Sequence, residues 1–390
     1  MSSITKKEML PKLRWRYAQR GKKGKTVLLN ELCEQWGYGR KYAIKLLNGA
    51  FVKKRKDQKK RGRPARYGKE VLEVLLRLWK EADGPCGKRL VVIKDLWLPH
   101  YEKAYGALRE EVKEQLKGIS AAQIDRLLAP YKIKRGRCWT KPGSILKTQI
   151  PIRTDNWDVS QPGFLEADTV AHCGGSLEDG FIWSVTFTDI YSQWTSNRAV
   201  WNKGGSGIVK ATRCVEASLP FKILGFDSDN GSEFLNKHLI RYFLNRPKPV
   251  GFTRSRPYHK NDNAHVEQKN WTHVRHLLGY DRLEEAEMVP LINEIYREIW
   301  EPYNNFFMPC MKLIKKERIG SKIKRIYDKP LTPCDRLLES SHLSEEVKEK
   351  LRLKRTSLNP MELKKLREKK LRKLFALQKA FAKKKAQLQS

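Results

Sequence analysis

The chain has 390 residues, which at roughly 150 residues per domain allows two or three domains and at least one sizeable core. It carries 80 Lys and Arg residues against 43 Asp and Glu, a formal charge of +37, so we expect a polyanion as partner. Hydrophobic residues at 40% and aromatic residues at 10% exclude a disordered basic tail protein. The absence of any apolar window of about 18 residues excludes a transmembrane span, and the charged N-terminus is no secretory signal, so we expect a cytoplasmic protein.

The charge is distributed unevenly along the chain. Residues 1–150 carry 38 basic and 14 acidic residues, residues 151–310 carry 17 and 20, and residues 311–390 carry 25 and 9. A near-neutral middle between two basic arms predicts that the arms bind the phosphate backbone. The carboxylate-rich middle is then expected to carry the chemistry.

The first expected unit is a helix-turn-helix within residues 1–52. Apolar residues recur close to helical spacing over residues 26–49, and a Gly-Tyr-Gly turn interrupts them. The second helix of such a motif enters DNA, so Arg40, Lys41 and Lys45 are the expected DNA contacts. An ordinary helical hairpin with a solvated basic face is the alternative.

A basic linker follows over residues 53–69, where the charge density precludes a core. Arg61 and Arg63 stand on either side of a glycine and just before a proline, which is typical of arginines that lie extended in an A·T-rich minor groove. Both are therefore candidate DNA contacts. A linker without a specific contact is the alternative.

Helical periodicity returns over residues 70–132 and predicts a second helical DNA-binding domain. Its last helix is expected to begin after Ser120, an N-cap residue type, and to bury Ile124, Leu127 and Leu128. This unit is a weaker helix-turn-helix candidate than the first. A basic connector over residues 133–155 leads into the middle of the chain.

The middle of the chain has β-rich runs bounded by Gly, Asp and Asn, which predict strands over residues 164–170, 181–189, 194–201, 221–226 and 250–253. Helical patterns lie between residues 201 and 221, after residue 233, and over residues 263–278. The order of three strands, helix, strand, helix, strand, helix predicts an α/β layer fold with a mixed sheet.

Three carboxylates occupy the positions where such a sheet places its chemistry. Asp168 lies in the first strand, Asp229 follows the fourth, and Glu267 lies on the last helix. Clustered carboxylates need cations, and oxygen ligands favour Mg²⁺; two ions about 3.5–4 Å apart can drive phosphodiester displacement. Asp227 is the rival ligand, because it precedes Asp229 by two residues and would share its face. Asp189 is expected to cap a turn rather than bind metal.

A basic and aromatic loop before the last helix is expected to grip DNA beside the scissile phosphate, through Arg254, Arg256, Tyr258 and Lys260. Lys269, two residues after Glu267, is a further candidate phosphate contact, with a solvated helix face as the alternative.

The C-terminal part is expected to contain a helix and a small β unit or arm over residues 286–340, then basic helices over residues 341–390. Asn359 and Pro360 mark a helix start. The leucine stripe that follows predicts packing on a partner subunit, contact along DNA, or a solvated tail.

Several stretches of the middle region resemble the three-carboxylate (DDE) transposases of bacterial insertion sequences, which have a retroviral-integrase-like catalytic core. The stretches are Glu166-Ala167-Asp168-Thr169, Thr188-Asp189-Ile190-Tyr191-Ser192, Asp229-Asn230-Gly231-Ser232-Glu233-Phe234, and Arg256-Pro257-Tyr258 leading to His265-Val266-Glu267-Gln268-Lys269-Asn270. Sixty residues separate Asp168 from Asp229 and 37 separate Asp229 from Glu267, close to the usual family spacing.

The resemblance implies a ribonuclease-H-like core over residues 156–285, with Asp168, Asp229 and Glu267 as catalytic residues and metal ligands. It implies two Mg²⁺ ions, replaceable by Mn²⁺, and double-stranded DNA as partner, both as element ends and as target. Nicking would free a 3′-hydroxyl at each end, and that hydroxyl would attack target DNA. A homo-oligomer, at least a dimer on DNA, and association with the bacterial nucleoid complete the expectation.

Two other functions fit part of the sequence. A sequence-specific DNA-binding regulator with a catalytically degenerate integrase-like core would use the basic arms, but it would have no need to keep all three carboxylates. A nuclease acting on RNA–DNA hybrids would use the core and leave both arms without a role.

Overall fold

The computed structural model describes residues 3–49, 66–132, 159–176, 178, 180–202, 204–228, 234, 237–254, 264–320 and 322–389. The chain forms two compact units, Met1–Arg66 and Tyr67–Ser390, each with its own hydrophobic core. Every helix in the described part of the chain is too short or too polar to span a bilayer.

The first unit consists of helices α1 (Ser3–Ala18), α2 (Lys22–Trp36) and α3 (Arg40–Leu47). Gly37 ends α2 in the left-handed conformation (φ 69°), where glycine has no steric penalty, and its N–H donates to the Cys33 carbonyl. The two helices and the glycine turn predicted from the sequence are confirmed. The sequence gave no signal for α1, which completes the small core of this unit.

The second unit begins with helices α4 (Lys69–Glu81), α5 (Gly87–Tyr105), α6 (Glu110–Gly118) and α7 (Ala121–Leu128), followed by the 3₁₀ turn η1 (Ala129–Tyr131). Ser120 caps α7 as predicted, because its Oγ accepts the Gln123 N–H at 3.3 Å. Trp97 of α5 is fully buried against Tyr303, with 5.9 Å between ring centroids. These helices therefore share a core with the rest of the second unit.

A five-stranded mixed sheet lies at the centre of the second unit, formed by β1 (Phe164–Ala171), β2 (Ile182–Asp189), β3 (Thr195–Trp201), β4 (Gly225–Ser228) and β5 (Gly251–Arg254). The strand order is β3-β2-β1-β4-β5. β1 is antiparallel to β2 and parallel to β4, and β4 is parallel to β5. The predicted order of strands and helices is confirmed, and the first and fourth strands are neighbours.

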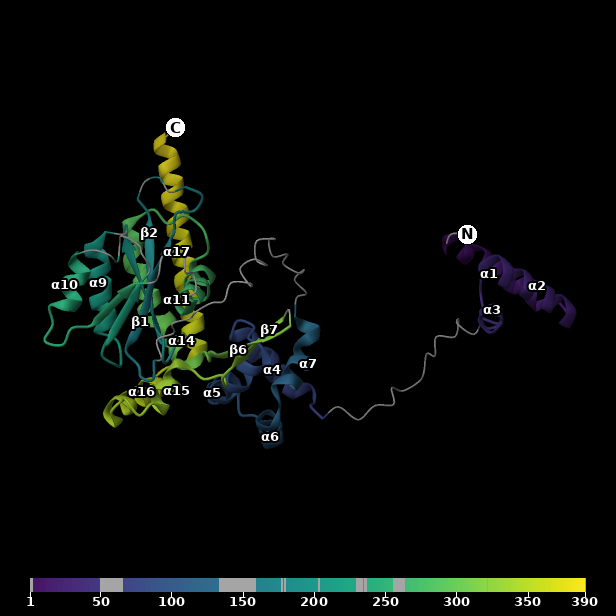
Figure 1. The fold of residues 1–390 in the computed structure, drawn as a ribbon, viewed down its shortest axis with the longest axis horizontal. Helices are drawn as coiled ribbons and strands as arrows, with labels where there is room; N and C mark the ends of the chain where they lie inside the picture. The colour runs from purple at the N-terminus through teal and green to yellow at the C-terminus, as the bar shows by residue number, and fades with distance from the viewer. Residues whose placement is uncertain are drawn as a thin grey trace. The chain divides into compact units, whose positions relative to one another are not determined.

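Helices cover both faces of this sheet. α9 (Gly205–Glu216) and α10 (Lys237–Leu244) pack on one face, over a core that includes Leu165, Ala167 and Phe226. On the other face lies one continuous helix over residues 264–278, formed by α11 (Ala264–Lys269), the π-helical turn η2 (Asn270–Arg275) and α12 (His276–Leu278). Figure 1 shows α9 and α10 on one side of the sheet and α11 on the other.

The C-terminal elements are the 3₁₀ turn η3 (Ala286–Met288), α13 (Val289–Glu294), the π-helical turn η4 (Ile295–Trp300), α14 (Glu301–Phe307), β6 (Leu313–Ile319), β7 (Lys322–Tyr327), α15 (Pro333–Glu339), α16 (Glu345–Ser357) and α17 (Pro360–Gln389). Asn359 caps α17 as predicted, with its Oδ1 accepting the Met361 N–H at 3.0 Å. The leucine stripe of α17, however, packs on this chain's own core, where Leu374 is fully buried. Partner subunit, DNA and solvent were all the wrong expectation for it.

Asp189 has the turn role that the sequence predicts. It is fully buried at the end of β2, where its Oδ1 accepts the Gly163 N–H at 2.8 Å. Its Oδ2 accepts the N–H and the hydroxyl of Ser192 at 2.7 and 2.6 Å. Because these donors occupy both oxygens, Asp189 ties the β2–β3 turn to the start of β1.

A buried histidine links β1 to the helical layer. The Nε2 of His172 lies 2.8 Å from Ser184 Oγ, which lies 2.8 Å from Tyr296 Oη. Burial, and secondarily the charge of Arg275, lowers the pKa of His172 from its ordinary value of 6.5 to about 3. The folded protein therefore holds this imidazole neutral.

We expect this histidine to make the second unit sensitive to acid. Below pH 6.5 the unfolded chain protonates His172 and the folded chain does not, so stability falls with pH until about pH 3. The loss is about 1.4 kcal/mol per pH unit for one such group. Denaturant unfolding at stepped pH should show a shallower acid slope for His172→Gln than for wild type. His342→Gln, at an exposed position, should keep the wild-type slope, and equal slopes in all three proteins would refute the assignment.

Candidate active site

Asp168 lies on β1 beside the point where β4 ends. The parallel register of the two strands pairs Glu166 with Asp227 and Ala167 with Ser228, the last residue of β4. The next residue along β1 is Asp168, and the next along the chain after Ser228 is Asp229. Residues 229–233 lie outside the described residues, so Asp229 remains a prediction.

Alternation along β1 separates its acidic residues from the apolar core. Leu165 and Ala167 contribute to the core beneath α9 and α10, so Glu166 and Asp168 face the opposite side. Asp227 is the register partner of Glu166 and shares that side. The sheet therefore presents three described carboxylates toward α11, and we call Glu166, Asp168 and Asp227 the acidic face.

The carboxylates of the acidic face have different surroundings. Glu166 is 3% exposed and Asp227 5% exposed, whereas Asp168 is only partly buried. The Thr253 hydroxyl on β5 donates to Asp227 Oδ1 at 2.8 Å. Asp227, the rival ligand, is thus a buried carboxylate held within the sheet, and Asp168 is the more accessible one.

Two hydrogen bonds fix the last helix against the acidic face. The Val266 N–H, in the first turn of α11, donates to Glu166 Oε2 at 3.0 Å. One turn later, Asn270 Nδ2 donates to Asp168 Oδ2 at 2.6 Å, while the Thr169 N–H donates to Asp168 Oδ1 at 2.7 Å. The helix is therefore clamped to β1 at both carboxylates.

These contacts bring Glu267 toward Asp168. Glu267 is exposed on α11, three residues before Asn270, and residues three apart on a helix share a side. Because Asn270 touches Asp168, Glu267 lies one helical turn from that contact. The π-helical turn begins at Asn270, and such turns occur frequently at functional sites.

The donor set fits a hard divalent cation. Asp168 and Glu267 offer only carboxylate oxygens, which suit Mg²⁺ or Mn²⁺ rather than zinc. Asn270 Oδ1 is a buried oxygen with no hydrogen-bond partner among the described residues. No group of three or more His, Cys, Asp and Glu side chains that could hold a metal occurs in the described ranges, which do not contain Asp229.

Lys269 occupies the protein interior. Its side chain is 8% exposed, and burial, together with the charges of Arg89 and Arg336, lowers its pKa. A phosphate contact by Lys269 would require this side chain to leave its buried position. We therefore do not include Lys269 in a DNA-binding surface.

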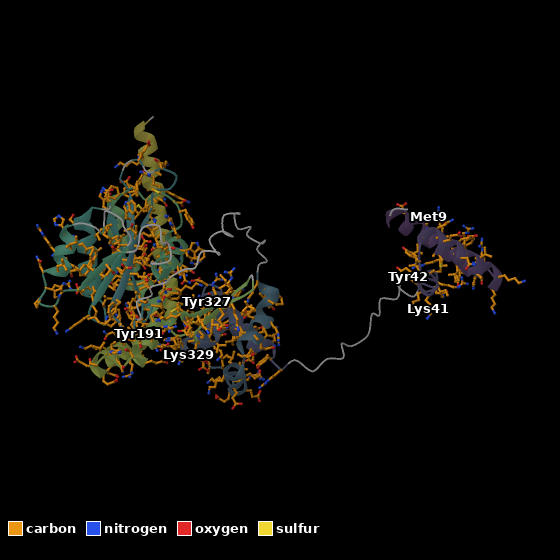
Figure 2. All side chains as sticks on the ribbon, in the orientation of Figure 1. Met9, Lys41, Tyr42, Tyr191, Tyr327 and Lys329 are labelled. Carbon is orange, nitrogen blue, oxygen red and sulfur yellow. The ribbon has the colours of Figure 1, made fainter. Side chains whose placement is uncertain are left out.

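The other predicted DNA contacts divide between the two units and the undescribed residues. Arg40, Lys41 and Lys45 are exposed on α3 of the first unit, where Figure 2 labels Lys41 beside Tyr42. Arg254 ends β5, and its side chain is not among those described. Arg61, Arg63, Arg256, Tyr258 and Lys260 lie outside the described residues.

The sequence analysis missed two residues of this site. Glu166 stands two residues before Asp168, so strand alternation alone places both carboxylates on one side. Asn270 stands three residues after Glu267 and therefore on the same helix side. Both spacings are visible in the sequence, but the contacts join residues about a hundred positions apart, which no local pattern predicts.

The fold and the acidic face together define the class of this protein. A mixed sheet in the order β3-β2-β1-β4-β5, with helices on both faces and aspartate on the central strand, is consistent with an integrase-like, ribonuclease-H-like core. The chain belongs to the same family as the uncharacterized protein y4rM of Sinorhizobium fredii (strain NBRC 101917 / NGR234). The two are 34% identical over 342 residues, which cover 86% of this chain and 96% of y4rM. No protein-family profile matches the chain.

Among solved structures, the chain is similar to retroviral integrase catalytic cores. The HTLV-2 integrase catalytic core domain in complex with magnesium is 17% identical, with a TM-score of 0.24 over 30% of this chain and 70% of that chain. The BIV integrase catalytic core is 13% identical, with a TM-score of 0.23 over 30% and 68%. A chain of the simian T-cell lymphotropic virus intasome is 13% identical, with a TM-score of 0.27 over 46% and 59%. Because these TM-scores are below 0.5, we base the function on this chain's own residues.

Proposed function

We propose that this protein is a DNA transposase of the three-carboxylate class, which binds the ends of its element, nicks them and joins them to target DNA. The observation that carries the proposal is the clamp of α11 on the acidic face, because it brings Glu267 to the side of Asp168 where β4 ends. A formal charge of +37 supports a polyanionic substrate.

In this proposal Asp168, Asp229 and Glu267 hold two Mg²⁺ ions, which activate the attacking oxygen and stabilise the leaving oxygen of a phosphodiester displacement. Asn270 orients Asp168 through its hydrogen bond to Oδ2. Glu166 holds the first turn of the helix that carries Glu267. The buried Asp227 and Thr253 support the neighbouring strands and do not contact substrate.

Two displacements at phosphorus account for the reaction. In the first, water attacks the phosphate at the element end, the bond to the 3′ oxygen breaks, and a free 3′-hydroxyl forms. In the second, that 3′-hydroxyl attacks a phosphate in target DNA, and the target strand leaves with its own 3′-hydroxyl. Both steps exchange one phosphodiester oxygen for another, so the same acidic face serves both. Two ends must be brought together, so we expect at least a dimer on DNA.

The test uses the purified full-length chain, labelled duplexes from the DNA flanking its own gene, a plasmid target and Mg²⁺. We expect strand-specific nicks that leave 3′-hydroxyls at the ends, followed by joined products, and no product when EDTA removes the metal. Duplexes with the same composition in shuffled order should not be nicked.

The other outcomes of this experiment have defined meanings. Tight binding of the end duplexes without nicking or joining, in Mg²⁺ and in Mn²⁺, would replace the proposal with a DNA-binding regulator. Hydrolysis of RNA–DNA hybrids without preference for the ends would replace it with a nuclease. Products that persist in Asp229→Asn would remove Asp229 from the site.

A further inference from the structure

β6 and β7 form a two-stranded hairpin, which we call the basic hairpin (residues 313–327), outside the five-stranded sheet (Figure 1). Nearly all its described side chains are exposed; only Glu317 and Ile326 are partly buried. Ile314 and Ile319 are 66% and 62% exposed. A hairpin of two strands is marginally stable without a covering layer, so this one invites a partner.

The two faces of the basic hairpin differ in charge. The antiparallel register pairs position 316 with Arg325, and Arg318 with Ile323, so these four positions share one face. That face contains three basic residues and no acidic residue. Like charges at directly opposed positions destabilise a hairpin in water. We call it the basic face of the hairpin.

The opposite face is partly neutralised within the protein. Glu317 is paired by register with Lys324, and the Lys324 Nζ lies 4.0 Å from a Glu317 carboxylate oxygen. The Lys315 Nζ lies 3.1 Å from the other oxygen. An internal carboxylate thus compensates two lysines on this face, whereas the basic face has no such compensation.

The root of the hairpin is fixed to the catalytic unit. Asp328 Oδ1 accepts the Lys312 N–H at 2.6 Å, and Asp328 Oδ2 pairs with Arg336 of α15 at 2.6 Å. The Lys312 Nζ donates to the carbonyl of Tyr191, in the turn after β2, at 2.8 Å. Figure 2 labels Tyr191 and, at the end of β7, Tyr327. The basic face is therefore presented from a fixed root on the unit that holds the acidic face.

We propose that the basic face of the hairpin binds a groove of duplex DNA. A two-stranded β-ribbon fits the major groove, and same-face residues advance by about 6.8 Å, the length of two base-pair steps. The phosphates would relieve the repulsion between positions 316 and 325, and Ile323 would contact base or sugar surface. The inference rests on the proposed function for its choice of DNA over an acidic protein, and it adds a binding surface to those in the basic arms.

The test compares two double variants with the same loss of charge on opposite faces of one hairpin. Arg318→Gln with Arg325→Gln changes the basic face, and Lys315→Gln with Lys324→Gln changes the compensated face. Fluorescence anisotropy would measure binding of the full-length proteins to duplex DNA, without divalent metal, over a series of salt concentrations. Thermal unfolding would establish that both variants are folded.

We expect the basic-face variant to lose at least about tenfold in affinity and to lower the log–log salt slope by about 1.8 in magnitude, at 0.9 for each phosphate contact. The compensated-face variant should keep most of the wild-type slope. Equal effects of the two variants, or no effect of either, would overturn the proposal, and unchanged duplex binding with normal nicking would favour an acidic protein partner. Because the binding assay needs no metal, a wild-type chain that fails to nick DNA refutes the catalytic proposal and leaves this test intact.

Discussion

Asp168→Asn is expected to lower end nicking and strand transfer by at least about 1,000-fold, because loss of a charged metal ligand removes several kcal/mol of transition-state stabilisation. Binding of the end duplex should be unchanged, since Asp168 makes its described contacts to Asn270 and to Thr169 rather than to a basic surface. Rates would be measured with labelled end duplexes in Mg²⁺, and binding by anisotropy without metal.

The substitution should leave the fold intact. The asparagine keeps one carbonyl oxygen, which can accept either the Asn270 amide or the Thr169 N–H, so the cost in stability is that of one hydrogen bond, about 1 kcal/mol. Glu368→Gln is the matched control, because it makes the same carboxylate-to-amide change at an exposed position of α17. Nicking by Asp168→Asn at the rate of this control would remove Asp168 from the site.

The sheet could be predicted from the sequence because its signals are local. Period-two runs bounded by Gly, Asp and Asn placed β1, β2 and β3 within a residue or two, and the helical runs between strands implied the parallel pair of β1 and β4. Local signals also predicted the caps at Ser120 and Asn359, since a cap involves residues at most three positions apart.

The remaining features depend on contacts between distant residues. A leucine stripe predicts that one face of α17 is buried, but not what covers it. The structure buries that face on the chain's own core and adds an ion pair between Arg367 and Asp83, at 2.9 Å. The helical unit before the sheet likewise has the periodicity of an independent domain, yet its Trp97 packs on Tyr303. Periodicity identifies the buried side of a helix and leaves its partner open.

The candidate site shows the same division. Asp168 and Glu267 were recognisable from residue type and spacing, whereas the roles of Glu166 and Asn270 became visible only when β1 and α11 met. A buried carboxylate beside a metal-ligand candidate has two interpretations, as a further ligand or as a support for the helix. The hydrogen bond from the Val266 N–H favours the support.

Glu166→Ala is therefore expected to reduce nicking and strand transfer by about 100-fold, the effect of misplacing a catalytic group by about 1 Å. The first turn of a helix has N–H groups without intrahelical partners, and Glu166 accepts one of them at 3.0 Å. Without the carboxylate, the Val266 N–H is left without its buried acceptor, which costs about 1–3 kcal/mol and allows the turn that carries Glu267 to shift. The rates would be measured on the end duplexes, with the unfolding midpoint beside them.

Glu166→Gln separates the support from a metal ligand, because the amide keeps an acceptor oxygen for Val266 and loses the charge. If Glu166 supports the helix, the Gln variant should retain most of the activity, and hydrogen exchange at residues 264–269 should be faster in the Ala variant than in the Gln variant. If Glu166 binds metal, both variants should lose activity equally, with no difference between them in exchange. Wild-type rates in Glu166→Ala would show that the helix holds its place without this hydrogen bond.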